Sequence, residues 1–108
     1  MVLEEVNGGI ECIRWSDKEV GFTVVGHYAG DGVSAAKNDL HYYLDENSVK
    51  KSFLSGVNLK PKFAKAPCLG VYFVVVHLGM KPNPNGGKDF RDFDVRFDRD
   101  NIHPSFKG

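Results

Sequence analysis

The stretch that decides the predicted fold is Leu69-Gly70-Val71-Tyr72-Phe73-Val74-Val75-Val76-His77-Leu78. Apolar side chains fill both alternating positions of this stretch, so a β-strand formed by it needs cover on both of its faces. Further on, the residues Phe93-Asp94-Val95-Arg96-Phe97-Asp98 alternate strictly between apolar and charged, which is typical of a strand covered on one face only. Residues 81–88 between them are rich in proline, asparagine and glycine. The sequence therefore predicts a long β-hairpin with a central first strand and a half-exposed second strand.

The composition is that of one ordinary globular domain. The chain has 108 residues, of which 42% are hydrophobic and 26% are charged. A chain of this length can bury a modest hydrophobic core without the support of disulfides. Fourteen Lys and Arg residues balance fourteen Asp and Glu residues. The neutral balance argues against non-specific nucleic-acid binding, which relies on a cationic surface. It also removes the self-repulsion that opposes association between copies of the chain.

Three shorter strands are expected before the hairpin. The turn Asn7-Gly8-Gly9 separates a strand at residues 2–6 from another at 10–15. Alternating apolar side chains predict a third strand over residues 20–28. The glycines of Gly30-Asp31-Gly32 are expected to end that strand.

Two helices are expected in the middle of the chain. The apolar residues between Val33 and Leu44 recur with helical spacing, and Ser48 is a suitable cap for a second short helix that ends before Gly56. Apolar residues in 40–45 also alternate, which leaves a short strand open as the alternative there. Residues 57–67 contain two prolines and are expected to form a crossing loop.

This order of elements predicts an α+β fold. Runs of strands with helices inserted between them favour a mainly antiparallel sheet over a parallel one. We expect a single domain over residues 1–108, with a sheet of four to five strands and one or two helices packed on one face.

The parity of the strands predicts which face of this sheet stays open. If Tyr72, Val74 and Val76 share the core face with the phenylalanines of the last strand, the opposite face carries a mixture of apolar and polar groups. A slip of one residue in the pairing would exchange every side chain and send His77 into the core. The candidate ligand- or partner-binding residues on the open face are His27, Phe73, Val75, His77, Asp94 and Arg96.

Two functions fit such a face. An apolar floor rimmed by charge is typical of a partner surface, so we expect a small non-enzymatic binding or interaction module that forms a homodimer through it. The alternative is a small hydrolase or ligand-binding enzyme that uses a His/Asp/Arg cleft on the same face. In that enzyme His27 and His77 would act as general acid and base, and Arg96 would steady an anion.

The remaining motifs favour structural interpretations. Residues 30–35 match the dinucleotide-binding pattern GxGxxA, but the chain is too short for a second βαβ half, so a glycine turn is the better reading. No histidine lies at metal-ligand spacing from another histidine or a cysteine, and the late aspartates lack the spacing of a calcium loop. We therefore expect neither a metal nor another cofactor.

The cysteines and the N-terminal residues predict a cytoplasmic protein. Cys12 and Cys68 are expected to be buried free thiols, with a single disulfide as the alternative. The N-terminal residues lack the pattern of a signal peptide, and the longest apolar stretch is too short to span a membrane. The expected partners are a second copy of the chain, another protein or a small ligand, rather than a membrane or a nucleic acid.

Overall fold

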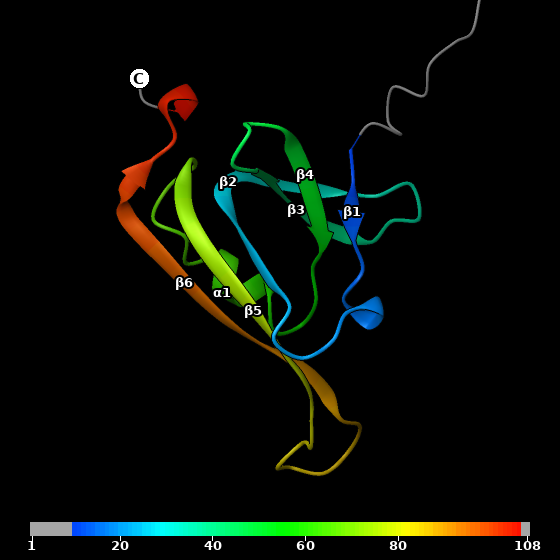
Figure 1. The fold of residues 1–108 in the computed structure, drawn as a ribbon. Coiled ribbons are helices and arrows are strands. Elements are labelled where there is room, and N and C mark those ends of the chain that lie inside the picture. The colour runs from blue at the N-terminus through cyan, green and yellow to red at the C-terminus, as the bar shows by residue number, and fades with distance from the viewer. Residues whose placement is uncertain (1–9, 107–108) are drawn as a thin grey trace, which may run out of the picture.

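The computed structural model describes residues 10–106, and within them the chain forms six strands and one short helix (Figure 1). Two single-turn 3₁₀ helices follow the first and the last strand, at Trp15–Asp17 and Pro104–Phe106. The strands and the helix, in chain order, are β1 (Cys12–Ile13), β2 (Thr23–Val33), β3 (Asp39–Leu44), β4 (Lys50–Leu54), α1 (Lys60–Phe63), β5 (Val71–Lys81) and β6 (Phe90–Ile102).

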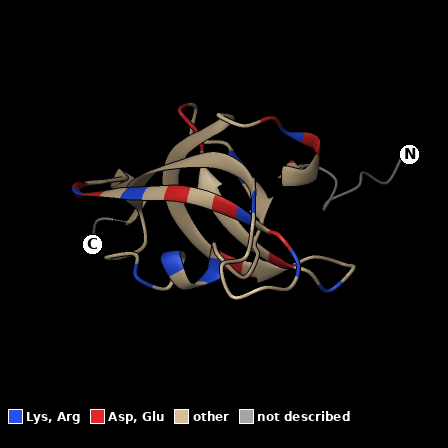
Figure 2. Ribbon diagram, turned by 90° about the horizontal axis from the view of Figure 1, so that it is seen from below, with Lys and Arg blue, Asp and Glu red and all other residues tan. Residues whose placement is uncertain are grey.

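The described strands form one mixed sheet in the order β1-β4-β3-β2-β5-β6. The pairing of β1 with β4 is parallel, and the other pairings are antiparallel. The sheet is strongly curled, as Figure 1 shows, and α1 lies against its concave side. We call this concave side the inner face and the convex side the outer face. Figure 2 shows that charges of both signs follow one another along β6, the edge strand, and that α1 carries lysines.

The expected α+β fold with helices packed on one face is wrong. Residues 33–44, predicted as a helix, contain the end of β2, a turn and β3, and residues 48–54, also predicted as a helix, contain β4. The strand left open as an alternative over residues 40–45 is the better description, because β3 spans Asp39–Leu44. The described part of the chain has its α-helix at Lys60–Phe63, inside the predicted crossing loop.

The cause of this error is the glycine pair that was expected to end the third strand. The β2 strand continues through Gly30, whose φ of 107° places it in the left-handed region, and the pairing with β3 shifts register between Tyr28 and Gly30. Glycine tolerates this conformation, so the pair creates a β-bulge that bends the strand instead of ending it. A long bent β2 can then pair with β5 at one end and with β3 at the other.

The predicted β-hairpin is present, but its faces are exchanged relative to our expectation. Phe73 pairs with Phe97, Val75 with Val95 and His77 with Phe93, so these residues share one face. That face is the inner one, where Phe73 and Val75 are fully buried. The pairing that was considered as a one-residue slip is therefore the observed one. It is favoured because it places the phenylalanines of both strands in one core.

The core is an aromatic cluster between the sheet and α1. Rings from four different elements meet edge to face, as in the pairs Phe53–Phe73 and Phe63–Phe97, with centroids 5.9 Å and 5.5 Å apart. Trp15 lies against Phe93 at 4.9 Å and donates its indole N–H to the carbonyl oxygen of Leu54 at 2.8 Å. Trp15 thereby links strands from opposite sides of the curled sheet, because Leu54 belongs to β4 and Phe93 belongs to the edge strand β6.

The predictions for the cysteines, the N-terminal strand and membrane-spanning segments have different outcomes. Cys12 and Cys68 are free, as expected, but both are exposed and not buried. The strand predicted at residues 2–6 lies outside the described residues. Among residues 10–106, no helix is long and apolar enough to cross a membrane.

Candidate active site

The structure divides the predicted binding residues between the two faces of the sheet. Phe73, Val75 and His77 belong to the buried inner face. The other three predicted residues, His27, Asp94 and Arg96, lie on the outer face of β2 and β6, because they alternate with inner-face residues. The expectation of one shared cleft is therefore wrong, and the sheet itself separates His27 from His77.

His77 is a core histidine with both ring nitrogens occupied. Its side chain is 2% exposed, and Nδ1 donates to the carbonyl oxygen of Glu19 at 3.0 Å. The guanidinium of Arg91 donates to Nε2 at 2.9 Å. Because a carbonyl only accepts and a guanidinium only donates, these partners fix the neutral Nδ1–H tautomer. The arrangement satisfies a buried polar group and leaves no ring nitrogen for a substrate.

The outer-face residues are spread along the surface. His27 donates from Nδ1 to the carbonyl oxygen of Gly70 at 2.8 Å and lies edge to face with Tyr72. Asp94 and Arg96 form an ion pair with one another at 3.2 Å, and the Arg96 side chain is 79% exposed. An ion pair this exposed contributes little to stability.

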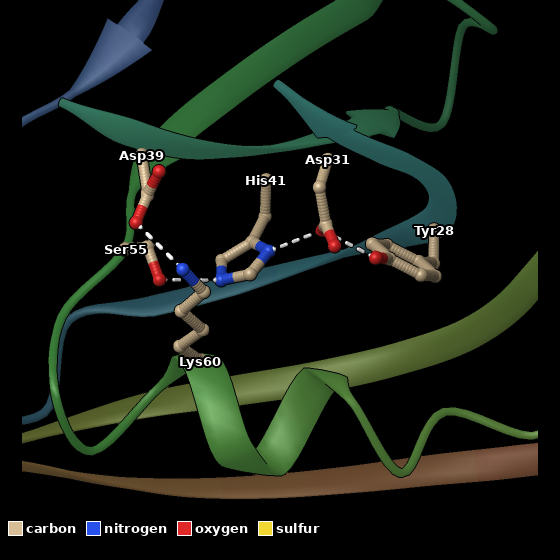
Figure 3. Close-up of polar contacts among 6 residues, drawn as sticks. All are labelled: Tyr28, Asp31, Asp39, His41, Ser55 and Lys60. Atoms are coloured by element: carbon tan, nitrogen blue, oxygen red, sulfur yellow. Dashed lines mark hydrogen bonds and ion pairs between the residues drawn. The ribbon is translucent and has the colours of Figure 1, made fainter. Parts of the chain in front are cut away.

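A different group of side chains has the geometry of a catalytic site, and Figure 3 shows it at the inner-face end of β2, β3 and β4. His41 of β3 is 2% exposed, and its Nδ1 is 2.6 Å from Oδ1 of Asp31 on β2. Its Nε2 is 2.8 Å from Oγ of Ser55, which directly follows β4. An ionised carboxylate can only accept, so Nδ1 carries the proton and Nε2 accepts from the Ser55 hydroxyl. Serine, histidine and aspartate are thus bonded in the order that activates a serine nucleophile.

The pairing of the strands explains why these three side chains meet. Asp31 and His41 are direct cross-strand partners, and Leu40 pairs with Leu54, so Ser55 comes next to the same end of β3. The backbone N–H of Ser55 donates to the carbonyl oxygen of Asp39 at 2.9 Å, which holds Ser55 in line with the strand after β4 ends. The bulge at Gly30 sets the direction of Asp31.

Two aromatic residues fix the position of His41 and Asp31. The ring of Phe63 from α1 stacks on the imidazole of His41, with centroids 4.7 Å apart and planes 24° apart. The hydroxyl of Tyr28 donates to the Asp31 oxygen that also binds His41 (Figure 3). Burial raises the pKa of the Tyr28 hydroxyl, and the hydrogen bond to Asp31 raises it further. Tyr28 therefore remains a neutral donor to the carboxylate.

Ser55 opens to solvent through two surface cavities. A cavity of about 400 Å³ is lined by Trp15, Val57 and Phe90 among others, and a cavity of about 360 Å³ is lined by Asn38, Asp39 and Lys60 among others. Leu54, Ser55, Gly56 and Val57 line both cavities, so Ser55 lies at their junction. Lys60 forms an ion pair with Asp39 at 2.9 Å, and this bond raises the pKa of the Lys60 ammonium.

A second serine–histidine pair has the opposite polarity. The backbone N–H of Ser105 donates to Nδ1 of His103 at 3.1 Å, so the neutral ring carries its proton on Nε2. Nε2 then donates to Oγ of Ser48, 3.0 Å away. His103 therefore cannot accept the proton of Ser48, which makes this pair a natural control for Ser55.

The comparisons with known proteins add no family to these observations. No family model, no curated protein and no solved structure matches the chain. Any function must accordingly be argued from the site itself.

No local motif in the sequence points to Ser55 or His41, and the residues around Asp31 were interpreted as the start of a helix. The available signal was the alternation of Asp39, His41 and Tyr43, which a strand would place on one face. The helical spacing of the neighbouring apolar residues concealed it.

Proposed function

We propose that the protein is a small serine hydrolase that cleaves an ester through an acyl-enzyme intermediate. The observation that carries the proposal is the hydrogen-bonded series from Ser55 through His41 to Asp31, with distances of 2.8 Å and 2.6 Å. Both distances lie within the range that a nucleophile, a general base and its orienting carboxylate require. Ser55 also lines two open cavities, so a substrate has access to the hydroxyl.

The proposed reaction has two balanced steps. In the first, Ser55 Oγ bonds to the ester carbonyl carbon, His41 Nε2 takes the hydroxyl proton and then gives it to the alcohol that leaves. In the second, water attacks the acyl-serine and passes a proton to His41, which returns it to Ser55 as the carboxylic acid is released. The net change is ester plus water to acid plus alcohol. Asp31 acts as a positioning residue that holds the tautomer of His41.

Negative charge on the carbonyl oxygen needs donors close to Ser55. The backbone N–H groups of Gly56 and Val57 donate no hydrogen bond to any other backbone group of residues 10–106. These two groups are available to stabilise the oxyanion, and the Lys60 ammonium lines the adjoining cavity. The Asp31 side chain is 62% exposed, so solvent screens its charge. We therefore expect a lower kcat than that of serine hydrolases in which the orienting carboxylate is buried.

The test is covalent labelling of the serine together with turnover. A fluorophosphonate probe should modify Ser55, and mass spectrometry of the labelled peptide locates the adduct. Ser55→Ala should reduce p-nitrophenyl butyrate hydrolysis by about 10²-fold or more, as expected for loss of an activated nucleophile. Ser48→Ala is the matched control, because its histidine cannot accept a proton, and it should keep full activity and labelling.

Two results would contradict the hydrolase. One is an adduct on residues other than Ser55 in the wild-type protein, which needs no folded variant to be informative. The other is equal turnover by the wild type and by Ser55→Ala, with circular dichroism showing the same thermal unfolding for both.

A further inference from the structure

The two cavities that meet at Ser55 differ in chemistry. The larger one has an aromatic and aliphatic wall, made by Trp15, Leu54, Val57, Phe90 and Phe93. The smaller one has a polar wall that includes Asn38, Asp39 and Lys60. A substrate bound at Ser55 would therefore have the aromatic side chains of Trp15, Phe90 and Phe93 on one side and Asn38, Asp39 and Lys60 on the other.

Ser16, Asn58, Asp89 and Arg91 also line the larger cavity, and two of them are bonded to the protein itself. Arg91 donates to His77 at 2.9 Å and to the carbonyl oxygen of Trp15 at 3.4 Å. The Asn58 amide donates to the carbonyl oxygen of Arg91 at 2.9 Å. Because these two donors already have partners, an apolar chain in this space gains contact with the aromatic wall without displacing their bonds.

The position of His41 decides which part of an ester enters which cavity. His41 must give a proton to the departing alcohol, so the alcohol leaves on the side of Nε2. A neighbouring cavity of about 260 Å³ is lined by His41, Asp39 and Lys60, and the last two residues also line the polar cavity beside Ser55. An alcohol that leaves toward Asp39 and Lys60 directs the acyl chain toward Trp15 and Phe90.

From this arrangement we infer that the enzyme selects esters by an aliphatic acyl chain held in the cavity lined by Trp15 and Phe90. The inference rests on the proposed hydrolase and adds its substrate class. A volume of about 400 Å³ lies within the range of small-molecule sites. Each methylene moved from water into this cavity should raise kcat/KM about fourfold, the change that corresponds to about 0.8 kcal/mol.

The experiment compares p-nitrophenyl acetate with p-nitrophenyl butyrate, which have the same leaving group. The wild type should prefer butyrate by about fifteenfold in kcat/KM, the product of two methylene contributions. Phe90→Ala removes one wall of the cavity at a half-buried position and should reduce this preference to a few fold. Asn38→Ala changes only the polar cavity and should leave the preference as it is.

The outcomes separate the inference from the function on which it rests. Equal kcat/KM for the two esters, with turnover that still requires Ser55, overturns the acyl selectivity alone. So does an unchanged preference in Phe90→Ala. Absence of Ser55-dependent turnover with either ester overturns the hydrolase, and the selectivity with it.

Discussion

Two buried histidines show how the same side chain can serve structure in one place and chemistry in another. His77 and His41 are both 2% exposed, and both donate from Nδ1. The partner at Nε2 distinguishes them, because His77 accepts from the permanently charged Arg91 whereas His41 accepts from a serine hydroxyl. Arginine does not give up its proton, but an activated serine does. The hydroxyl partner is what makes His41 a candidate general base.

The orienting carboxylate gives a prediction for Asp31. Asp31→Asn can place an amide donor against Nδ1 and so favour the wrong tautomer of His41. We expect kcat for p-nitrophenyl butyrate to fall about 10²-fold while KM stays the same, because Asp31 does not touch the substrate. Steady-state kinetics measure both values. Asp94→Asn, on the outer face, is the control and should change neither, and a variant of Asp31 with wild-type kcat would contradict its positioning role.

The other buried histidine gives a prediction about stability. Arg91→Met removes the donor to Nε2 of His77 and leaves a buried acceptor without its partner. We expect a loss of about 1–3 kcal/mol in the free energy of unfolding, measured by urea denaturation. Arg96→Met, on the same strand but 79% exposed, should stay within about 0.5 kcal/mol of the wild type. Equal losses of unfolding free energy in Arg91→Met and Arg96→Met would show that the hydrogen bond between Arg91 and His77 does not stabilise the fold.

At the scale of elements, the bent β2 strand depends on close contact with its neighbour β3. A Cβ atom at Gly26 would lie 2.6 Å from the carbonyl oxygen of Leu44 and 2.6 Å from the ring of Tyr43. Gly26→Ala should therefore destabilise the fold by about 1–3 kcal/mol, because backbone atoms must move. Gly56→Ala meets no atom within 4 Å and is the matched control for thermal unfolding. A Gly26→Ala variant as stable as that control would contradict the tight packing of β2.

The turn between β3 and β4 gives a prediction about pH. A hydrogen bond from the Val49 N–H lowers the pKa of Asp45, and Lys51 lowers it further. The folded-state pKa lies below the unfolded one, so the stabilisation is present above the unfolded value and is lost as pH falls through the folded value. Asp45→Asn should be less stable than the wild type at neutral pH, and the difference in urea midpoints should shrink in acid. A difference that is constant with pH would contradict this interpretation.

The sequence predicted elements well where one periodicity dominated. The hairpin of β5 and β6 was predicted because β5 is a long apolar stretch and β6 alternates clearly between apolar and charged residues. The inner and outer faces of this hairpin were predicted the wrong way round, because β5 has apolar side chains on both faces. Only the phenylalanines of β6 determine which face of β5 is buried. Residues 33–44 were mistaken for a helix because this window joins the end of β2, a turn and β3, so its apolar residues do not follow one alternation. An alternation that is interrupted by a turn can resemble helical spacing over a short window.

At the scale of the whole molecule, the candidate site was beyond prediction from local motifs. Asp31, His41 and Ser55 come from three different places in the chain, and no short spacing connects them. They meet only because β3 lies between β2 and β4 in the sheet. Knowledge of that strand order would have been needed to see the triad, since catalytic groups are recognised by geometry and not by sequence position.

Self-association, expected from the sequence, remains a prediction and now concerns a different set of residues. The outer face of β2 and β5 carries Val25, which is 42% exposed, with Val74 beside it. Charges of both signs on β6 adjoin this strip (Figure 2), and the net charge of the chain is zero. An apolar strip with neutral surroundings favours contact between two copies. Light scattering at micromolar concentration should therefore give the mass of a dimer.

Val74→Lys tests whether that strip forms the contact. Val74 points away from the core, so a lysine there should leave the fold intact while placing two like charges in a symmetric interface. We expect the variant to be a monomer at concentrations where the wild type is a dimer. Val49→Lys, an exposed valine in the β3–β4 turn, is the control and should still dimerise. A dimer that survives Val74→Lys would place the contact elsewhere, and a monomeric wild type would remove the outer face as a self-association surface.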